Sequence, residues 1–434
     1  MIEFARIDDL VARFSRLGAT RIFFKRLSEN DNNKQQIYLG GSFEALSVFP
    51  HGVVTAHGDL KDPNFKADLR LFWVAPETTE EAPHAQLILY PKYPEVRLSG
   101  FLRGCRTAPN EHLRPIPRME RRGVDGRILF FGVTNDRQTF VHLAPAGSPL
   151  AKEAAAAWPD AVGSLFTELP AGGKSGNDKR ALLLDTLGEI HRRGFVASAK
   201  LDRNGIMQPY LARNGGGYTL EALLGIRPNG DAQPDFLGWE VKAFSTGRIT
   251  LMTPEPNGGI YGQKGAEVFV RRYGRKMAGK DQLYFTGAHV FGVPSARTGL
   301  TLVLNGFDPA TGKITDVNGA IQLTDAAGTN TASWAFSHLL THWNRKHASA
   351  VYVRYKKSAD TPPQYRYLSP VSLGEHTDFA KYLSALARGS VVFDPGSKID
   401  NASTAKSRVK ARSQFRIKYK DLASLYDVFD IAEL

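Results

Sequence analysis

The sequence predicts two folded domains, a mostly β domain over residues 1–148 and an α/β domain over residues 181–434, joined by a linker over residues 149–180. Short apolar runs separated by Asn-, Asp-, Pro- and Gly-rich connections dominate the first region, as in a β module. The last region alternates helical and strand patterns, which is typical of an α/β domain. The stretch between them is rich in Ala, Gly, Pro and Lys, as expected for a linker.

The elements of the first domain begin with one helix, indicated by Leu10, Val11, Phe14 and Leu17 at helical spacing. Strand patterns follow it in the order RIFFKRL, QIYLGG, ADLRLFWVA, AQLILY and RILFFGV. These runs are rich in β-branched, aromatic and other apolar residues, and turn-forming residues separate them. We therefore expect a compact β module.

The elements of the second domain are helices interleaved with few, short strands. Helices are predicted at ALLLDTLGEIHRRG and at the Gly-led GGGYTLEALLGI, followed by a strand pair, WEVKAF and RITLMT. The helix WAFSHLLTHWNRKH then leads into the strand SAVYVRYKK, and a further helix is predicted at HTDFAKYLSALARG.

The chain carries 56 Lys and Arg against 43 Asp and Glu, a formal net charge of +13. This excess favours a polyanionic partner, because each phosphate that a cationic side chain neutralises releases condensed counterions. A basic protein with only a solvated, repulsive surface remains the alternative at this point. No apolar run approaches the ~18 residues of a membrane-spanning helix, and the segment MIEFARIDDLVARF lacks the features of a signal peptide. We therefore expect a cytoplasmic protein without a membrane partner.

Three further motifs do not support a function of their own. GGKSG at residues 172–176 resembles a phosphate-binding loop, but Glu168 stands where that loop has its first glycine, and no strand precedes it. His338 and His342 have the spacing of a metal-binding pair, but they lack a third ligand nearby, so a half-buried helix face is the preferred interpretation. Cys105, the only cysteine, has no histidine partner in sequence, and it excludes an internal disulfide and a cysteine zinc site.

The stretch PDFLGWEVKAF, residues 234–244, places two carboxylates and a lysine in an apolar strand pattern. Alternation along WEVKAF points Glu240 and Lys242 to one face and the apolar residues between them to the core. A turn at Gly238 lets Asp235 return beside Glu240, where two carboxylates repel each other unless a cation lies between them. Oxygen ligands suit Mg²⁺, and a neighbouring lysine can hold, or help deprotonate, a water aimed at a phosphate. An exposed amphipathic strand with an incidental Glu–Lys pair remains the alternative.

The motif P-D-x(4)-E-x-K is similar to the PD-(D/E)xK nuclease signature, and its surroundings resemble the MvaI–BcnI restriction endonuclease family. The resemblance runs in consistent order through GGGYTLEALLG, PDFLGWEVKAF, RITLMTPEPNGG, VFVRRYGRK, WAFSHLLTHWNRKHASAVYV and ARSQFRIKYKDL. It implies an α/β PD-(D/E)xK nuclease core over residues 181–434. In this core Asp235 and Glu240 would bind Mg²⁺, Lys242 would be the catalytic lysine and Glu221 an accessory acid. It also implies hydrolysis of double-stranded DNA at a short CCWGG- or CCSGG-like sequence.

The C-terminal segment departs from the family pattern. The family has histidines just ahead of F-R-I, whereas this chain has AKSRVKARSQFRI. Arg and Lys bond guanine edges and phosphates equally well, so the exact target sequence stays open. The residues of this domain predicted to bind DNA are Arg271, Arg272, Arg275, Lys406, Arg408, Lys410, Arg412 and Arg416.

Two polar segments of the first domain, RIFFKRLSENDNNKQQIYLGG and YPKYPEVRLSGFLRG, are predicted to bind DNA through amide and basic side chains. Ordinary charged hairpins remain the alternative. Both segments resemble the DNA-gripping arms of the EcoRII-type N-terminal effector domain, which implies a mostly β pseudobarrel. The predicted contacts are Lys25, Arg26, Asn30, Asn33, Lys34, Gln35, Gln36, Lys92, Tyr93, Glu95, Arg97, Ser99 and Arg103.

Together these patterns favour a Type II, IIE-like restriction endonuclease that needs a second copy of its site bound to an N-terminal effector domain. We expect a monomer that acts in phage defence, with a separately encoded DNA methyltransferase as its functional counterpart. A nicking or modification-dependent nuclease and a catalytically silent DNA-binding regulator remain alternatives.

Overall fold

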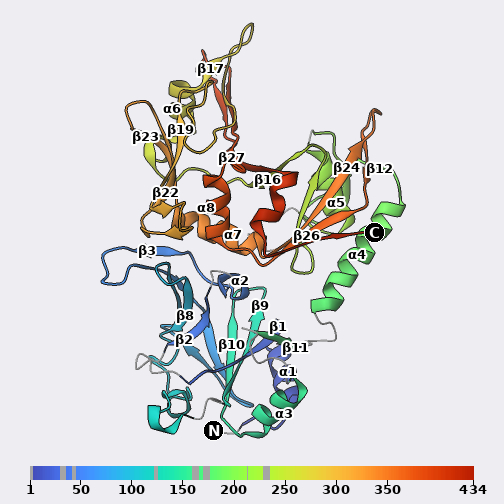
Figure 1. Ribbon diagram of the computed structural model, residues 1–434. Coiled ribbons are helices and arrows are strands. Elements are labelled where there is room, and N and C mark those ends of the chain that lie inside the picture. The colour runs from blue at the N-terminus through green and yellow to red at the C-terminus, as the bar shows by residue number, and fades with distance from the viewer. Residues whose placement is uncertain are drawn as a thin grey trace. The chain divides into compact units, whose positions relative to one another are not determined.

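Figure 1 shows the computed structural model of the chain, which describes residues 3–29, 36–41, 45–121, 126–158, 166–169, 176–212, 214–227 and 235–434. Its contacts divide the chain into two compact units. Met1–Thr55 and Asn64–Ala181 form the first unit, and Ala56–Pro63 and Leu182–Leu434 form the second. Among the described helices, none is both long enough and apolar enough to cross a membrane.

The first unit is built on two sheets. One has the strand order β11-β1-β9-β10-β5-β6, and the other contains β2, β8, β7 and β4 as successive neighbours. Neither order closes on itself, so the described strands form open sheets and no closed barrel, and the predicted pseudobarrel stays a prediction. The bounds are α1 (Ile7–Arg16), β1 (Ala19–Arg26), β2 (Ile37–Gly40), α2 (Ala45–Val48), β3 (Thr55–His57), β4 (Asn64–Asp68), β5 (Leu71–Val74), β6 (Thr79–Ala82), β7 (Gln86–Tyr90), β8 (Glu95–Ser99), β9 (Ile128–Thr134), β10 (Thr139–Ala144), α3 (Pro149–Ala157) and β11 (Thr167–Leu169).

The strand β1 is buried on both faces, which explains its continuous apolar run. Ile22 and Phe24 belong to a core cluster with residues of α1 and α3. Phe23 points the other way and stacks on Phe131 of β9, with ring centroids 5.4 Å apart. A strand that is covered on both faces has an uninterrupted apolar sequence and not an alternating one.

The predicted N-terminal helix is confirmed as α1, whose Leu10 and Phe14 are fully buried. Its close packing on the sheet depends on Gly132 of β9. A Cβ added there would lie only 2.6 Å from the Phe14 ring, so a larger residue would push the helix away.

The second unit contains a sheet of order β12-β25-β24-β26-β31, and β15 pairs with β24 in parallel. Residues of α4 and α5 form one apolar cluster with β15 and β24, in which Leu187, Leu220 and Val351 are buried. The bounds are α4 (Gly176–Arg192), β12 (Val196–Ala197), β13 (Ala199–Leu201), β14 (Met207–Pro209), α5 (Gly215–Leu223), β15 (Glu240–Phe244), β24 (Ser349–Lys357), β25 (Gln364–Tyr367), β26 (Val371–Glu375) and β31 (Val428–Ala432). The predicted helices at α4 and α5 and the predicted strand at β24 are confirmed.

The predicted pairing of WEVKAF with RITLMT is wrong. β15 pairs with β24, whereas β16 (Arg248–Met252) pairs with β30 (Phe415–Lys418) in a separate sheet of order β16-β30-β27, where β27 is Val391–Phe393. That sheet buries Ile249 and Leu251 almost completely. This tertiary packing outweighs the local preference for a hairpin.

A sheet of order β17-β18-β28-β29, with α6 packed on β18 and β28, forms an arm of the second unit. Figure 1 shows α6 and β17 at one side of this unit and α5 and β24 at the other, with the predicted helices α7 and α8 between them. The bounds are α6 (Gly259–Tyr273), β17 (Arg275–Lys276), β18 (Gln282–Thr286), β19 (Thr301–Asn305), β20 (Phe307–Asp308), β21 (Lys313–Ile314), β22 (Ala320–Thr324), β23 (Asn330–Ala335), α7 (Phe336–His347), α8 (Phe379–Ala387), β28 (Gly396–Asp400) and β29 (Arg408–Lys410).

Candidate active site and DNA-binding surfaces

Glu240 is a buried acid at the start of β15. Its residue is 1% exposed, and its carboxylate forms an ion pair with the ammonium of Lys242, whose side chain is 22% exposed. Trp239 and Val241 point into the apolar cluster on the opposite face. The predicted alternation is therefore confirmed, and the alternative of an exposed amphipathic strand is excluded. A carboxylate buried to this extent needs a charged or hydrogen-bonding partner.

A tight turn returns Asp235 to β15. Leu237 and Gly238 both have positive φ, 52° and 91°, and a non-glycine residue in this conformation marks local strain. The Asp235 carboxylate then accepts a hydrogen bond from the backbone N–H of Val241 at 3.0 Å. Pro234, the first residue of the motif, lies outside the described residues.

The helix α5 brings Glu221 to the same place. Its Gly216 lies against the ring of Tyr355, where an added Cβ would overlap with the ring. The carbonyl oxygen of Gly216 accepts a hydrogen bond from the Tyr367 hydroxyl at 2.7 Å. This approach places Glu221 close enough for its charge to act on Lys242.

The charges of three carboxylates act on Lys242, and one of them, Glu240, is its ion-pair partner. Burial lowers the pKa of the Lys242 ammonium, but Glu240, Asp235 and Glu221 together outweigh burial, so the pKa lies above its ordinary value. Lys242 therefore keeps its proton. The structure thus brings together the four side chains that the sequence predicted for the site, whose catalytic roles remain predictions.

The oxygen donors of this site fit a Mg²⁺ ion. Asp235 and Glu240 supply carboxylate oxygens, and Mg²⁺ is commonly bound through one or two carboxylates with water and phosphate oxygens completing its coordination. The described residues contain no group of three His, Cys, Asp or Glu side chains placed to hold a metal ion. Most of the coordination of a Mg²⁺ ion here would therefore come from water and substrate.

The other motifs do not form a second site in the described residues. The rings of His338 and His342 contact each other edge-on on α7, with centroids 4.8 Å apart, which agrees with a half-buried helix face. Burial raises the pKa of the half-buried Cys105 thiol, so little reactive thiolate forms there. The GGKSG motif lies outside the described residues except for Gly176.

Two buried tyrosines beside the site were missed by the sequence analysis. Tyr352 lies opposite Lys242 in the parallel ladder, and its hydroxyl is hydrogen-bonded to the hydroxyl of Tyr426 at 2.7 Å. Burial raises the pKa of both hydroxyls, and the charge of Glu240 raises it further. The only sequence signal is the polar tip of Tyr352 within the apolar strand SAVYV.

The sheet of the arm has one apolar and one polar face. Phe285 and Ile399 are buried on the apolar face, where the ring of Phe285 contacts Phe269 of α6 at 4.8 Å. Register places one row of side chains across all four strands of the polar face and a second row beside it. The rows are Arg275, Tyr284, Lys398 and Lys410, and then Gln282, Asp400 and Arg408.

Three of the predicted DNA contacts, Arg275, Arg408 and Lys410, therefore share this polar face. Lys406 and Arg412 are exposed on either side of β29. The strands fix the spacing between cations, because neighbouring strands lie about 4.8 Å apart.

The other predicted DNA contacts of this unit bind protein groups. Arg271 donates to Glu267 and to a backbone carbonyl, and the guanidinium of Arg272 lies 5.3 Å from the Tyr273 ring centroid. Arg416 forms an ion pair with Asp394 at 2.9 Å.

In the first unit the β2–β8 pair brings the two predicted polar segments together. Tyr38 lies opposite Arg97 in this pair. Arg97 donates to Gln36 at 3.0 Å and to Glu95 at 2.6 Å. The ammonium of Lys25 lies 5.7 Å from the Tyr38 ring centroid, and burial lowers its pKa.

The remaining predicted contacts of the first unit are dispersed. Arg26 donates to the carbonyl oxygen of Trp158 at 2.8 Å, and Lys92 lies 5.2 Å from the exposed Tyr93 ring. Ser99 ends β8, and Arg103 is exposed after it. Asn30, Asn33, Lys34 and Gln35 lie outside the described residues.

Comparison with known proteins identifies the second unit. The model of the MvaI/BcnI restriction endonuclease family matches residues 184–426. The chain therefore belongs to the MvaI/BcnI restriction endonuclease family, and it is a site-specific DNA endonuclease. No curated protein matches the sequence significantly.

Solved structures similar to this chain include two of the restriction endonuclease MvaI. The complex of MvaI with its cognate DNA has 18% identity and a TM-score of 0.45, and covers 59% of this chain and 99% of that one. MvaI in the absence of DNA has 15% identity and a TM-score of 0.32, and covers 60% and 99%. The B3 domain of the UbaLAI restriction endonuclease, with cognate DNA, has 18% identity and a TM-score of 0.24, and covers 37% and 94%. The predicted EcoRII-type N-terminal domain stays a prediction.

Proposed function

We propose that this family member is a Type II restriction endonuclease of the IIE kind, which uses Mg²⁺ to hydrolyse double-stranded DNA at a short CCWGG- or CCSGG-like sequence. The observation that carries the proposal is the convergence of Asp235, Glu240 and Glu221 around Lys242 at the start of β15. Carboxylates that the fold holds together beside a charged lysine are typical of sites that bind a divalent cation next to an anionic substrate.

In this proposal Asp235 and Glu240 would bind Mg²⁺, which when bound polarises the phosphate and lowers the pKa of a water. Lys242 keeps its proton, so it donates hydrogen bonds to the attacking water or to a phosphate oxygen and offsets developing negative charge. Glu221 accepts a hydrogen bond from that water and orients it. As the oxygen of that water bonds to phosphorus, Glu221 takes the proton that the water loses and the bond from phosphorus to the leaving sugar oxygen breaks. The leaving oxygen takes a proton from solvent.

The polar face of the arm is the proposed DNA-reading surface of the nuclease unit. Arg275, Arg408 and Lys410 lie in its two rows with a glutamine, a tyrosine and an aspartate between them. Such a mixture suits recognition, because cations hold phosphates while Arg, Gln and Asp can also pair with base edges. The polar segments around Gln36 and Arg97 are the proposed DNA-binding surface of the first unit.

We further propose a monomeric cytoplasmic enzyme that acts in phage defence. A separately encoded DNA methyltransferase would modify the same sequence and protect the host DNA. The net charge of +13 supports a DNA partner.

The test is digestion of plasmid DNA with Mg²⁺ and with a chelator, using the wild-type chain, Glu240→Gln and Asp235→Asn. Each variant removes a proposed metal ligand and keeps the side-chain shape, so we expect cleavage to fall by roughly a thousandfold or more. DNA binding in metal-free buffer should be kept or tightened, because a negative charge near phosphate is lost. Asp360→Asn, an exposed acid in the turn between β24 and β25, is the matched control. Near-normal cleavage by either site variant would contradict the assignment.

The products of the wild-type chain separate the alternatives. Linear DNA cut at one sequence supports the restriction endonuclease, and open circles indicate a nicking enzyme. Cleavage confined to methylated plasmid indicates a modification-dependent nuclease, and specific binding without cleavage at any metal concentration indicates a regulator.

A further inference from the structure

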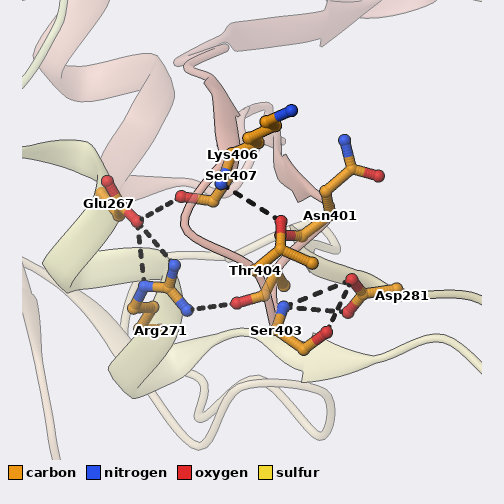
Figure 2. A network of polar contacts seen from close by, with 9 residues as sticks. Glu267, Arg271, Asp281, Asn401, Ser403, Thr404, Lys406 and Ser407 are labelled. Atoms are coloured by element: carbon orange, nitrogen blue, oxygen red, sulfur yellow. Dashed lines mark hydrogen bonds and ion pairs between the residues drawn. The ribbon is translucent and has the colours of Figure 1, made fainter.

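Figure 2 shows a network of polar contacts between α6, the turn after β17 and the loop of residues 401–407, which joins β28 to β29. Arg271 on α6 donates two hydrogen bonds to Glu267 Oε1, at 3.0 and 2.6 Å, and one to the carbonyl oxygen of Ala402, at 2.8 Å. The same Glu267 oxygen accepts a hydrogen bond from the Ser407 hydroxyl at 3.0 Å. One arginine and one glutamate thus hold both ends of the loop. The bonds from Arg271 and Ser407 lower the pKa of Glu267, which keeps the acid charged at neutral pH.

A second anchor comes from Asp281, which immediately precedes β18. Its carboxylate accepts hydrogen bonds from the backbone N–H of Ser403, at 3.0 and 3.3 Å, and from the Ser403 hydroxyl, at 2.8 Å. Inside the loop the Thr404 hydroxyl donates to the carbonyl oxygen of Asn401 at 3.1 Å and accepts from the N–H of Lys406 at 3.2 Å. The loop is therefore tied to two neighbouring elements and to itself.

This loop sets the position of the exposed cations beside it. Lys406 is exposed within the loop, and Arg408 and Lys410 are exposed on β29, which the loop enters directly. β29 is an edge strand of three residues. So short a strand makes few ladder hydrogen bonds, and its register depends on the segment that leads into it.

We propose that Glu267, Arg271 and Asp281 are positioning residues for sequence recognition. They lock loop 401–407 so that Lys406 in the loop and Arg408 and Lys410 on β29 meet DNA in one fixed arrangement. The inference rests on the proposed function of the polar face. Arg271, which the sequence assigned to DNA, acts here on the loop, because its donors are already directed at Glu267 and Ala402. A base edge is read only in a narrow geometry, whereas a phosphate accepts a cation from many directions. Unlocking the loop therefore lowers discrimination between sequences more than it lowers general DNA affinity.

Arg271→Lys separates this role from a direct phosphate contact. Lysine keeps the positive charge, but it cannot bond Glu267 twice and the Ala402 carbonyl at the same time. A contact with phosphate would survive the change in large part, whereas the set of hydrogen bonds that holds loop 401–407, here called the lock, would not. We expect Arg271→Lys and Arg271→Ala to lower the ratio of kcat/KM on cognate DNA to kcat/KM on a singly substituted duplex by about tenfold.

Glu267→Ala and Asp281→Ala change the charge of the arm in the opposite direction to Arg271→Ala, because each removes a negative charge. General electrostatics predicts tighter DNA binding from both changes, whereas the lock predicts the same loss of discrimination as in the Arg271 variants. Glu111→Ala is the matched control, since the exposed Glu111 begins a short 3-10 helix of the first unit, Glu111–Leu113, and pairs with Arg114 at 2.7 Å.

The measurement uses the full chain and a duplex whose sequence is defined by the wild-type cut ends. We expect the slope of log affinity against log salt to stay unchanged in the Arg271 variants, whereas loss of a phosphate contact would reduce it by about 0.9. Hydrogen exchange of the amides at 401–407 is a second readout that does not need activity, and we expect faster exchange in every lock variant.

Wild-type discrimination and wild-type loop protection in Arg271→Lys would overturn the inference, as would a reduced salt slope in Arg271→Ala. A wild-type chain that cuts without sequence preference would instead contradict the proposed function, before any variant is compared. A variant that fails to fold leaves Arg271→Lys and the exchange measurement to decide the question.

Discussion

Lys242 neutralises Glu240, an acid that is almost completely removed from water. Lys242→Met removes this compensation and leaves Glu240 near a second carboxylate, Asp235. We expect the free energy of unfolding to fall by about 1–3 kcal/mol, because a buried charge is left without its ion pair. Adding Glu240→Gln to Lys242→Met should recover most of the loss, since an amide carries no charge.

Chemical denaturation of the two single variants and the double variant at pH 7 measures this coupling. Groups that neutralise each other give a non-additive double-mutant cycle. Additive losses would mean that Lys242 does not compensate the charge of Glu240.

Two buried histidines, His142 in the first unit and His289 in the second, link folding to pH. Burial lowers the pKa of each imidazole to about 4, against an ordinary value of 6.5. Between these values the unfolded chain binds more protons than the folded chain. The free energy of unfolding is therefore highest above pH 6.5. It falls as the pH drops toward 4, by up to roughly 3 kcal/mol for each histidine.

We expect His142→Asn to flatten this pH dependence, because asparagine does not titrate there and its amide N–H can replace the hydrogen bond to the Val74 carbonyl oxygen. Denaturation midpoints from pH 4 to 7 provide the measurement, with the exposed His84→Asn as control. An unchanged slope in His142→Asn would show that the pKa of His142 is the same in the folded and the unfolded chain.

At the scale of the element, the packing of α5 decides where Glu221 lies. Gly216→Ala puts a methyl group into the Tyr355 ring and must displace the helix or the ring. We expect a loss of about 1–3 kcal/mol of stability from overpacking, together with slower cleavage. Gly217→Ala on the same helix meets nothing within 4 Å, so it should stabilise the chain by up to about 1 kcal/mol through helix propensity.

Thermal unfolding and the cleavage rate of both variants check this prediction. Equal unfolding temperatures and equal cleavage rates of Gly216→Ala and Gly217→Ala would show that the contact with Tyr355 does not set the position of α5.

The same elements show what the sequence could predict. Helices such as α1, α7 and α8 were predicted because their apolar spacing is a local property of the chain. The pairing of β15 was predicted wrongly, because its partner β24 lies more than a hundred residues away and no local pattern encodes that contact. The Gly-led start of α5 was visible, but the tyrosine that requires Gly216 was not.

The candidate site divides in the same way. Asp235, Glu240 and Lys242 could be predicted because one turn and one strand place them, and alternation follows from the strand. Tyr352 and Tyr426 could not, because the hydroxyl pair forms only when β24 and the C-terminal segment meet in the fold. Arg271 shows the converse, since a basic residue in a family motif makes its contacts to protein groups.

At the scale of the whole molecule, the proposed IIE behaviour requires two DNA sites for one chain. If the first unit is an effector, a plasmid with one recognition site should be cut slowly, because a single site cannot occupy both units. A short duplex carrying the same site should then accelerate cleavage, because binding at the effector shifts the enzyme toward its active state. The measurement is the initial rate on one-site and two-site plasmids, with and without the duplex.

Arg97→Ala tests whether the acceleration acts through the first unit. Arg97 lies opposite Tyr38 and donates to Gln36 and Glu95, so its loss releases polar side chains that are proposed to meet DNA. This should raise the concentration of duplex needed for half-maximal acceleration by roughly tenfold. Raising the salt concentration should also raise the duplex concentration needed for half-maximal acceleration, because duplex binding to a basic surface weakens as ions compete. Equal rates on one-site and two-site plasmids, with no response to added duplex, would contradict the effector role and leave the first unit as a tether that only raises the local DNA concentration.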